Sequence, residues 1–218
     1  MNRGSTTVNK ITKYLREEIT YSRLKSGQHL KESEISKEFN VSRVPVREAF
    51  RILQSEGYID VIPNRGSFVK IITREYILEM ALLYRLLAPA VLEKAIPKYN
   101  DKTYLKAEKI LRKVEKCSDM NQIGYLLWDY AKVIYGPSKM KYILGLYDDI
   151  YLHNLRSLNE VFEIKQKKHY DISPHREFLK LCRENKINEA INHWGSYLVK
   201  IQQIMLKDKD KSKKKLKP

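Results

Sequence analysis

The chain has 218 residues, of which 43% are hydrophobic, and its formal net charge is +16. That length allows two modest domains with buried cores, and the hydrophobic fraction excludes a chain that is disordered throughout. The positive charge favours a polyanionic partner such as nucleic acid. The first ten residues are mostly polar, and no apolar run approaches the length of a membrane span. The two cysteines lack metal-ligand spacing, so we expect reduced thiols in a cytoplasmic protein with no membrane partner.

Residues 34–54 predict two short helices joined by a tight turn. Apolar residues repeat at helical spacing on both sides of the segment Asn40-Val41-Ser42. Asn40 suits a left-handed position that closes the first helix, and Ser42 suits the N-cap of the second. This pattern is typical of a helix-turn-helix with Val41 buried in the corner. The apolar residues are Ile35 and Phe39 before the turn and Val46, Phe50 and Leu53 after it.

The second of these helices carries a basic row. Arg43, Arg47 and Arg51 follow one another at intervals of four, on the face opposite the apolar residues. On an ordinary helical hairpin such a row would be a solvated face. Together with the turn and the cap, it favours a recognition helix whose first turn meets base edges while flanking arginines and hydroxyls hold phosphates. A guanidinium at Arg43 is suited to reading guanine O6 and N7.

Residues 58–71 predict a β-hairpin directly after this helix. Residues 58–62 and 67–71 alternate as strands, and Pro63-Asn64-Arg65-Gly66 has the composition of a turn. A hairpin in this place is a wing. Its tip, with Asn64, Arg65 and Gly66, is suited to a minor groove or to the phosphates beside it.

Separated motifs in this half, in the same order, resemble the winged-helix domain of GntR-type transcription regulators. The resemblance covers about residues 8–72 and implies a dimer that binds a short palindromic operator in double-stranded DNA. It places Ser42, Arg43, Pro45 and Arg47 at DNA contacts of the recognition helix, and Arg65 and Gly66 at the wing tip. The motifs are Leu24-x-x-Gly-x-x-Leu-x-Glu, Val41-Ser42-Arg43-x-Pro45-Val46-Arg47-Glu48-Ala49, Glu56-Gly57 and Asn64-Arg65-Gly66.

From Thr73 onward the periodicity predicts helices alone, so the expected fold is mainly α, with a winged helix-turn-helix before an all-α bundle. Pro89 lies inside the first of these helices, where we expect a kink or a break. The expected domains are residues 1–72 for DNA binding, 73–206 for effector binding and dimerisation, and 207–218 as a disordered basic tail. That tail would add nonspecific DNA affinity or only improve solubility.

The helical half resembles the effector-binding domain of the FadR-like (FCD) branch of the GntR regulators. The resemblance covers residues 73–206 and depends on helix order and on Arg85, Asp129 and His175 with Arg176. It implies a ligand pocket and, in many members, a divalent metal such as zinc held by an aspartate, a histidine four residues later and two further histidines.

Only part of that metal site is present in this sequence. Asp129 and His175 match two ligands, Val133 occupies the place of the second, and the last falls near Ser196 and Tyr197. The sequence therefore leaves two alternatives: a metal bound at Asp129 and His175, or a degenerate site that binds none. Without a metal, Arg85, Asp129, His175 and Tyr197 would line a polar pocket for a small effector such as an organic acid or another metabolite.

The expected function is a ligand-responsive DNA-binding transcription regulator that acts as a homodimer. The alternative is a constitutive DNA-binding protein whose helical domain only dimerises. The sequence offers no nucleophile–base set and no glycine-rich phosphate loop, so we do not expect an enzyme. Tyrosines crowded in the middle of the bundle either line an effector cavity or pack with their hydroxyls in water. They are Tyr125, Tyr130, Tyr135, Tyr142, Tyr147 and Tyr151.

Overall fold

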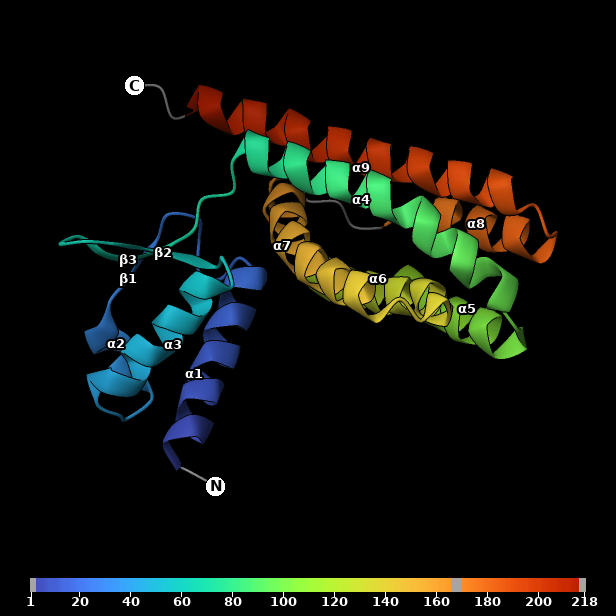
Figure 1. The fold of residues 1–218 in the computed structure, drawn as a ribbon. Helices are drawn as coiled ribbons and strands as arrows, with labels where there is room; N and C mark the ends of the chain where they lie inside the picture. The colour runs from blue at the N-terminus through green and yellow to red at the C-terminus, as the bar shows by residue number, and fades with distance from the viewer. Residues whose placement is uncertain (1–2, 166–169, 216–218) are drawn as a thin grey trace. The chain divides into compact units, whose positions relative to one another are not determined.

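The computed structural model describes the backbone of residues 3–165 and 170–215 (Figure 1). Side chains are described for these residues except 3–5, 153–154, 156–165 and 207–215. The chain divides into two compact units, Met1–Ile72 and Thr73–Pro218, which we call the N-terminal unit and the helical unit. In the residues described, no helix combines the length and the apolar character needed to span a bilayer.

The N-terminal unit is a winged helix-turn-helix, as the sequence predicts. Its helices are followed by a hairpin, and a short strand between α1 and α2 completes a three-stranded antiparallel sheet of order β1-β3-β2. The elements are α1 (Arg3–Thr20), β1 (His29–Leu30), α2 (Glu32–Glu38), α3 (Arg43–Ser55), β2 (Ile59–Ile62) and β3 (Gly66–Val69).

The core of this unit lies where α1 packs against α3. Apolar side chains at helical spacing on both helices are fully buried, and they meet Tyr58, Ile59 and Val69 from the hairpin. Arg16 of α1 also donates hydrogen bonds to both carboxylate oxygens of Glu56, including Nη2–Oε1 at 2.7 Å and Nε–Oε2 at 3.0 Å. This paired contact joins α1 to the end of α3. The buried helix residues are Val8, Ile11, Leu15 and Ile19 on α1, and Val46, Ala49, Phe50 and Leu53 on α3.

Strand β1 is one element that the sequence did not predict. It pairs antiparallel with β3 through His29 opposite Phe68 and Leu30 opposite Ser67. A strand of two residues is too short to show an alternating pattern, so only its partner strand identifies it. As a result, the inner wing strand β3 is paired on both sides, which fixes the position of the hairpin.

The helical unit contains no strand in the residues that the structure describes, in agreement with the predicted all-α half. Side chains cap several helix starts: Thr73 accepts from the backbone N–H of Tyr76, and Asn100 accepts from that of Thr103. The elements are α4 (Arg74–Ala95), η1 (Ile96–Lys98), α5 (Asp101–Lys116), α6 (Met120–Tyr135), η2 (Gly136–Ser138), α7 (Lys141–Lys165), α8 (Ser173–Arg183) and α9 (Ile187–Lys215).

Two long helices, α4 and α9, lie side by side and run in opposite directions along the helical unit (Figure 1). Helices α5 and α6 pack together, α6 also contacts α7, and α8 packs on α9. The shared core is rich in aromatic residues: Tyr130, Phe178 and Trp194 are all at least 96% buried. The helices therefore enclose large rings rather than a purely aliphatic core.

The structure agrees with one expectation for this unit and differs from another. Helix α4 continues through Pro89 to Ala95 without a break, and it changes direction along its course in Figure 1, in line with the kink expected as one of the two outcomes. The backbone of α9 is helical as far as Lys215, whereas the sequence predicted a disordered tail from residue 207. Lysine is a good helix former, so a helix that begins in the core can continue into the tail. Residues 216–218 of that tail lie outside the described residues.

Gly124 allows α6 to approach α7 closely. A methyl group added at Gly124 would lie 2.0 Å from Cδ1 of Leu155, which is 1% exposed, whereas one added at Gly145 on α7 would meet no atom within 4 Å. We expect the Gly124→Ala variant to have a free energy of unfolding about 1–3 kcal/mol below that of Gly145→Ala, because only the first overpacks the core. Both tryptophans, Trp128 and Trp194, belong to the helical unit, so denaturation followed by tryptophan fluorescence measures this difference. Equal stabilisation by both alanines would contradict the close packing.

Candidate nucleic-acid interface and effector cavity

The turn between α2 and α3 has the backbone that the sequence predicted. Asn40 adopts a left-handed conformation with φ 50°, and the N–H of Val41 donates to the carbonyl of Ser36 at 2.9 Å. Ser42 occupies the N-cap of α3 with extended backbone, but its side chain accepts no capping hydrogen bond. Val41 is half-buried rather than fully buried. The hydroxyl of Ser42 is thus exposed beside the first turn of α3.

The outer face of α3 carries the three arginines. Arg43, Arg47 and Arg51 are all exposed, while Val46 and Phe50 point into the core. Among the described residues, Arg43 and Arg51 form no hydrogen bond or ion pair, so both guanidinium groups have all their donors available. Pro45 differs from the other predicted contacts because it is half-buried in the first turn of α3.

Arg47 is held by a neighbouring helix. Its Nε donates to Oε2 of Glu32, at the start of α2, over 2.8 Å. The Arg47 side chain is 60% exposed, so this ion pair contributes little to stability. Glu32 accepts from Nε alone, so the N–H groups on Nη1 and Nη2 stay open to solvent.

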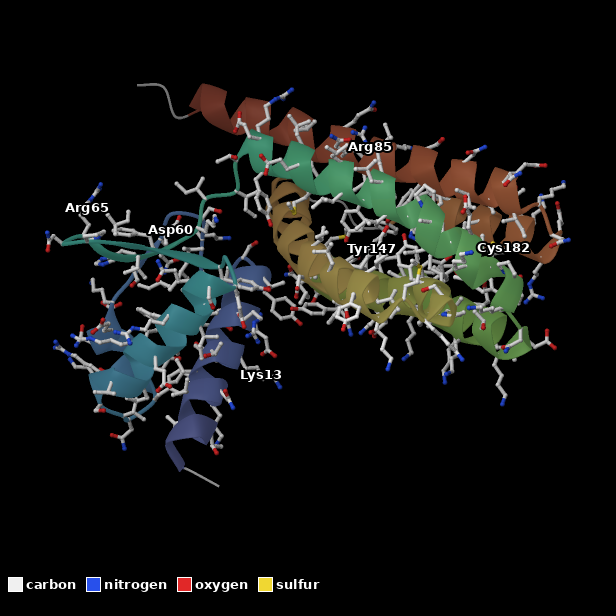
Figure 2. All side chains as sticks on the ribbon, viewed as in Figure 1. Lys13, Asp60, Arg65, Arg85, Tyr147 and Cys182 are labelled. Atoms are coloured by element: carbon white, nitrogen blue, oxygen red, sulfur yellow. The ribbon has the colours of Figure 1, made fainter. Side chains whose placement is uncertain are left out.

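The wing tip is fully exposed. Asn64 has φ 61° and Gly66 has φ 99°, and the N–H of Arg65 donates to the carbonyl of Ile62 at 3.0 Å. Arg65 extends from the end of the hairpin in Figure 2. A side chain at residue 66 would approach Nε2 of His29 to 2.6 Å, so glycine is required both by the backbone and by the contact with β1.

The helical unit contains a cavity of about 100 Å³ among α4, α6, α7, α8 and α9, which we call the aromatic cavity. Its lining is mostly apolar and aromatic, and each of these five helices contributes a ring. The polar groups on these rings mostly bond to one another: Nε1 of Trp194 donates to the hydroxyl of Tyr135 at 2.6 Å, and the hydroxyls of Tyr170 and Tyr197 form a hydrogen bond. The ring-bearing residues include Tyr135, Tyr151, Tyr170, His175, Trp194 and Tyr197.

His175 is the most buried polar side chain of this lining, with 2% of its surface exposed. Its ring lies 4.8 Å from that of Tyr197 and 5.3 Å from that of Trp194, both edge to face. Burial lowers the pKa of His175 to about 3, with Asp171 opposing and His193 reinforcing the shift. Within the described part of the chain, its Nδ1 has no hydrogen-bond partner. His175 is therefore a neutral imidazole at physiological pH.

The other predicted effector residues are not at the cavity. Arg85 is exposed on α4, and Asp129 is exposed on α6, where it pairs with Lys132 at 2.7 Å. Of the four predicted residues, the structure brings His175 and Tyr197 together and leaves Arg85 and Asp129 outside the lining. Figure 2 shows Arg85 on the ribbon of α4.

Residues 7–69 match the family model described as "Bacterial regulatory proteins, gntR family". The N-terminal unit is therefore similar to the gntR family of bacterial regulatory proteins. The match ends at the last residue of β3, so the wing is inside it and the helical unit is outside it.

Curated relatives extend this likeness in part. The transcriptional repressor RspR of Escherichia coli is 37% identical over 86 residues, which cover 39% of this chain and 38% of RspR. The gluconate operon transcriptional repressor of Bacillus subtilis is 28% identical over 167 residues, which cover 74% of this chain and 65% of that repressor. This chain thus spans less than two-fifths of RspR in the part that matches.

Solved structures share the fold over both units. A putative GntR transcriptional regulator from Rhodococcus has a TM-score of 0.77 at 19% identity, and covers 92% of this chain and 98% of its own. McbR/YncC of E. coli has a TM-score of 0.77 at 17% identity, and the match covers 93% of this chain and 98% of McbR/YncC. At these identities the likeness concerns the fold alone. Both solved regulators combine a winged domain with a helical domain of the architecture seen in this chain.

The residues in place do not fit the divalent metal that the FadR-like resemblance implies. Asp129 faces solvent, Val133 offers no ligand, and Nε2 of His193 already bonds to the carbonyl of Pro174 at 2.8 Å. No group of three or more His, Cys, Asp or Glu within the described side chains could hold a metal ion. His175 is enclosed by aromatic rings instead of carboxylates, so it lacks the partners that a metal site needs.

Sequence reasoning missed several residues of both sites. Glu32 is fifteen positions from Arg47, and no local pattern marks a contact between two helices at that separation. Tyr170 and Trp194 face the cavity from segments that sequence spacing does not relate. The crowded tyrosines gave a partial signal, because Tyr135 and Tyr151 do line the cavity, whereas Tyr142 is 97% exposed.

The neutral, buried state of His175 makes the helical unit sensitive to acid. The unfolded chain binds a proton at this site below about pH 6.5, whereas the folded protein does so only near pH 3, so stability falls as the pH drops between these values. From about pH 7.5 to about pH 5, the wild type should lose roughly 2 kcal/mol more unfolding free energy than His175→Phe. Urea denaturation followed by tryptophan fluorescence at both pH values measures the unfolding free energy of each protein. The same loss in both proteins would contradict a neutral His175.

Proposed function

We propose that this chain is a ligand-responsive transcription regulator that binds operator DNA through its N-terminal unit. The observation that carries the proposal is the outward row of Arg43, Arg47 and Arg51 on a helix whose other face is fully buried. The chemistry of the face supports it, since this helix presents guanidinium groups and little else that is charged. RspR and the gluconate operon regulator are repressors, and repression is the sense of regulation we propose.

In this proposal the first turn of α3 enters the major groove. Arg43 is exposed at the N-terminus of the helix, where an unpaired guanidinium can donate two hydrogen bonds to guanine O6 and N7. Arg51 lies two turns further along and would hold a phosphate, as would the hydroxyl of Ser42. Arg65 at the wing tip would reach the adjacent minor groove.

Glu32 makes Arg47 differ from Arg43. Its carboxylate occupies Nε of Arg47, so Arg47 would contact DNA with the N–H groups on Nη1 and Nη2. The carboxylate also offsets part of the positive charge of Arg47, and it would repel a nearby phosphate. Arg43 is therefore the residue on which sequence specificity should depend most.

Substitution of Arg43 tests base reading. We expect Arg43→Ala to weaken binding to a site selected in vitro by about 1–3 kcal/mol, and to weaken binding to random DNA much less. Lys13→Ala is the matched control, because it removes one exposed positive charge from α1 of the same unit. Fluorescence anisotropy at a fixed salt concentration measures the six affinities of the wild type and the two variants for selected and random DNA. Equal losses on selected and random DNA, or equal losses in both variants, would contradict base reading by Arg43.

The helical unit offers a surface for the proposed homodimer. Leu78, Leu82 and Leu86 are spaced by four along α4 and are 39%, 47% and 64% exposed. Such a continuous apolar stripe is uncommon on a monomer surface. A two-fold pair of helical units would present two winged domains to the two halves of a palindromic operator.

A charge placed in this stripe tests the dimer. We expect Leu82→Lys to convert a dimer into a monomer in analytical ultracentrifugation, because it buries an unpaired ammonium in the interface. Leu105→Lys is the matched control, since Leu105 is 68% exposed on α5, away from the stripe. A dimer that survives Leu82→Lys unchanged, or dissociates equally in both variants, would contradict dimerisation through α4.

One observation favours a second candidate, a constitutive DNA-binding protein with a degenerate effector site. Arg85 and Asp129 lie outside the cavity, so the polar pocket expected from the sequence is not assembled. The two candidates differ in whether a small molecule changes the affinity for DNA. An effector must favour one arrangement of the winged domains to alter DNA affinity, whereas a constitutive binder has the same affinity with and without any small molecule.

A further inference from the structure

The aromatic cavity has a chemical character of its own. Among the residues whose side chains the structure describes, none that lines it is a lysine, an arginine, an aspartate or a glutamate. A charged group placed inside would leave water without gaining a counter-charge, which is among the most unfavourable changes in a protein interior. The lining therefore selects against carboxylates, phosphates and ammonium groups.

The imidazole of His175 presents a polar atom to the cavity. Nδ1 of His175 is buried and has no hydrogen-bond partner in the part of the chain that the structure describes. Buried polar atoms in native proteins nearly always have a partner, so this atom offers a hydrogen bond to a polar group that enters the cavity. The hydroxyls of Tyr135, Tyr151 and Tyr197 are already engaged with Trp194, Gly124 and Tyr170.

The size of the cavity limits what can enter. An engineered apolar cavity of about 150 Å³ binds benzene. At about 100 Å³, the aromatic cavity has room for a molecule on the scale of one small ring. Edge-to-face and tilted contacts with the surrounding rings would favour an aromatic occupant over an aliphatic one.

We propose that the aromatic cavity binds an uncharged, mostly apolar ligand of about single-ring size through one hydrogen bond to Nδ1 of His175. The ligand class differs from the organic acid and the metal that the sequence suggested, because the charged residues needed for either lie elsewhere. The role of the cavity as an effector site rests on the proposed function. The binding of a ligand there depends only on the residues that line the cavity.

The occupant supplies what the cavity lacks. A hydroxyl can donate to Nδ1 when the imidazole carries its proton on Nε2, or accept from Nδ1 in the other tautomer. His175 joins α8 to the cavity, and its carbonyl accepts from the hydroxyl of Tyr130 on α6 at 3.2 Å. A ligand bound there would tie together α6, α8 and α9, and its binding energy would stabilise one packing of these helices.

The test compares three probes of similar size on the full-length protein. Phenol is neutral and carries one hydroxyl, benzene is neutral and carries none, and benzoate is charged. Binding is measured by isothermal titration calorimetry and by the shift in melting temperature followed by tryptophan fluorescence. Zinc chloride is added in a separate series to test for a metal site.

Two substitutions locate the binding. His175→Phe keeps a ring in place and removes Nδ1, so it should weaken phenol binding by about tenfold and leave benzene binding nearly unchanged. Ala81→Leu fills the cavity from α4 and should abolish binding of both. Ala90→Leu is its control, because Ala90 is exposed on the same helix and does not line the cavity.

The expected result is binding of phenol, weaker binding of benzene and at least about tenfold weaker binding of benzoate. The proposal is overturned if benzoate or zinc stabilises the protein as much as phenol does. It is also overturned if neither neutral probe binds, or if Ala81→Leu and Ala90→Leu bind phenol equally. Binding to a selected DNA site is measured alongside. If the wild type does not bind selected DNA, the proposed function is contradicted, while the probe titrations still decide which ligands the cavity binds.

Discussion

Burial of one face of α3 against α1 decides which side chains of that helix reach solvent. Val46, Ala49, Phe50 and Leu53 are at most 3% exposed, so α3 cannot rotate about its axis without opening the core. With a helical period of 3.6 residues, fixing this face also fixes Arg43, Arg47 and Arg51 on the side exposed to solvent. The hydrophobic effect thus positions charged groups that contribute nothing to the core themselves, and the contact of Arg16 with Glu56 holds the end of the same helix.

In the helical unit, side-chain packing encloses a cavity. Its core is built from large rings that meet edge to face around a space they do not fill, and His175 contributes a neutral polar atom to that space. The charged residues that the sequence offered for a metal or an acid lie on the surface, where Asp129 pairs with Lys132. The fold is shared with GntR-type regulators, while the chemistry of this interior belongs to the residues of this chain.

Local patterns predicted much of this molecule. The recognition helix, the left-handed Asn40 and the wing could be predicted because each depends on residues within a few positions of one another. Strand β1 could not, since two residues carry no period, and neither could the contact of Glu32 with Arg47 across two helices. Tyr142 and Tyr147 show the limit most clearly: they lie on one helix with the same residue type, yet one is 97% exposed and the other 4%. Which tyrosine faces the core depends on helices far away in the sequence.

The account depends most on Arg43 reading a guanine in the major groove, and replacing guanine by 7-deazaguanine in a selected binding site tests this directly. The change removes only the N7 acceptor and leaves base pairing intact. The wild type should lose about tenfold in affinity at one guanine in each half-site, and Arg43→Ala should lose nothing further at that guanine. Wild-type binding that tolerates the replacement at every guanine, or an equal loss in Arg43→Ala, would contradict the account.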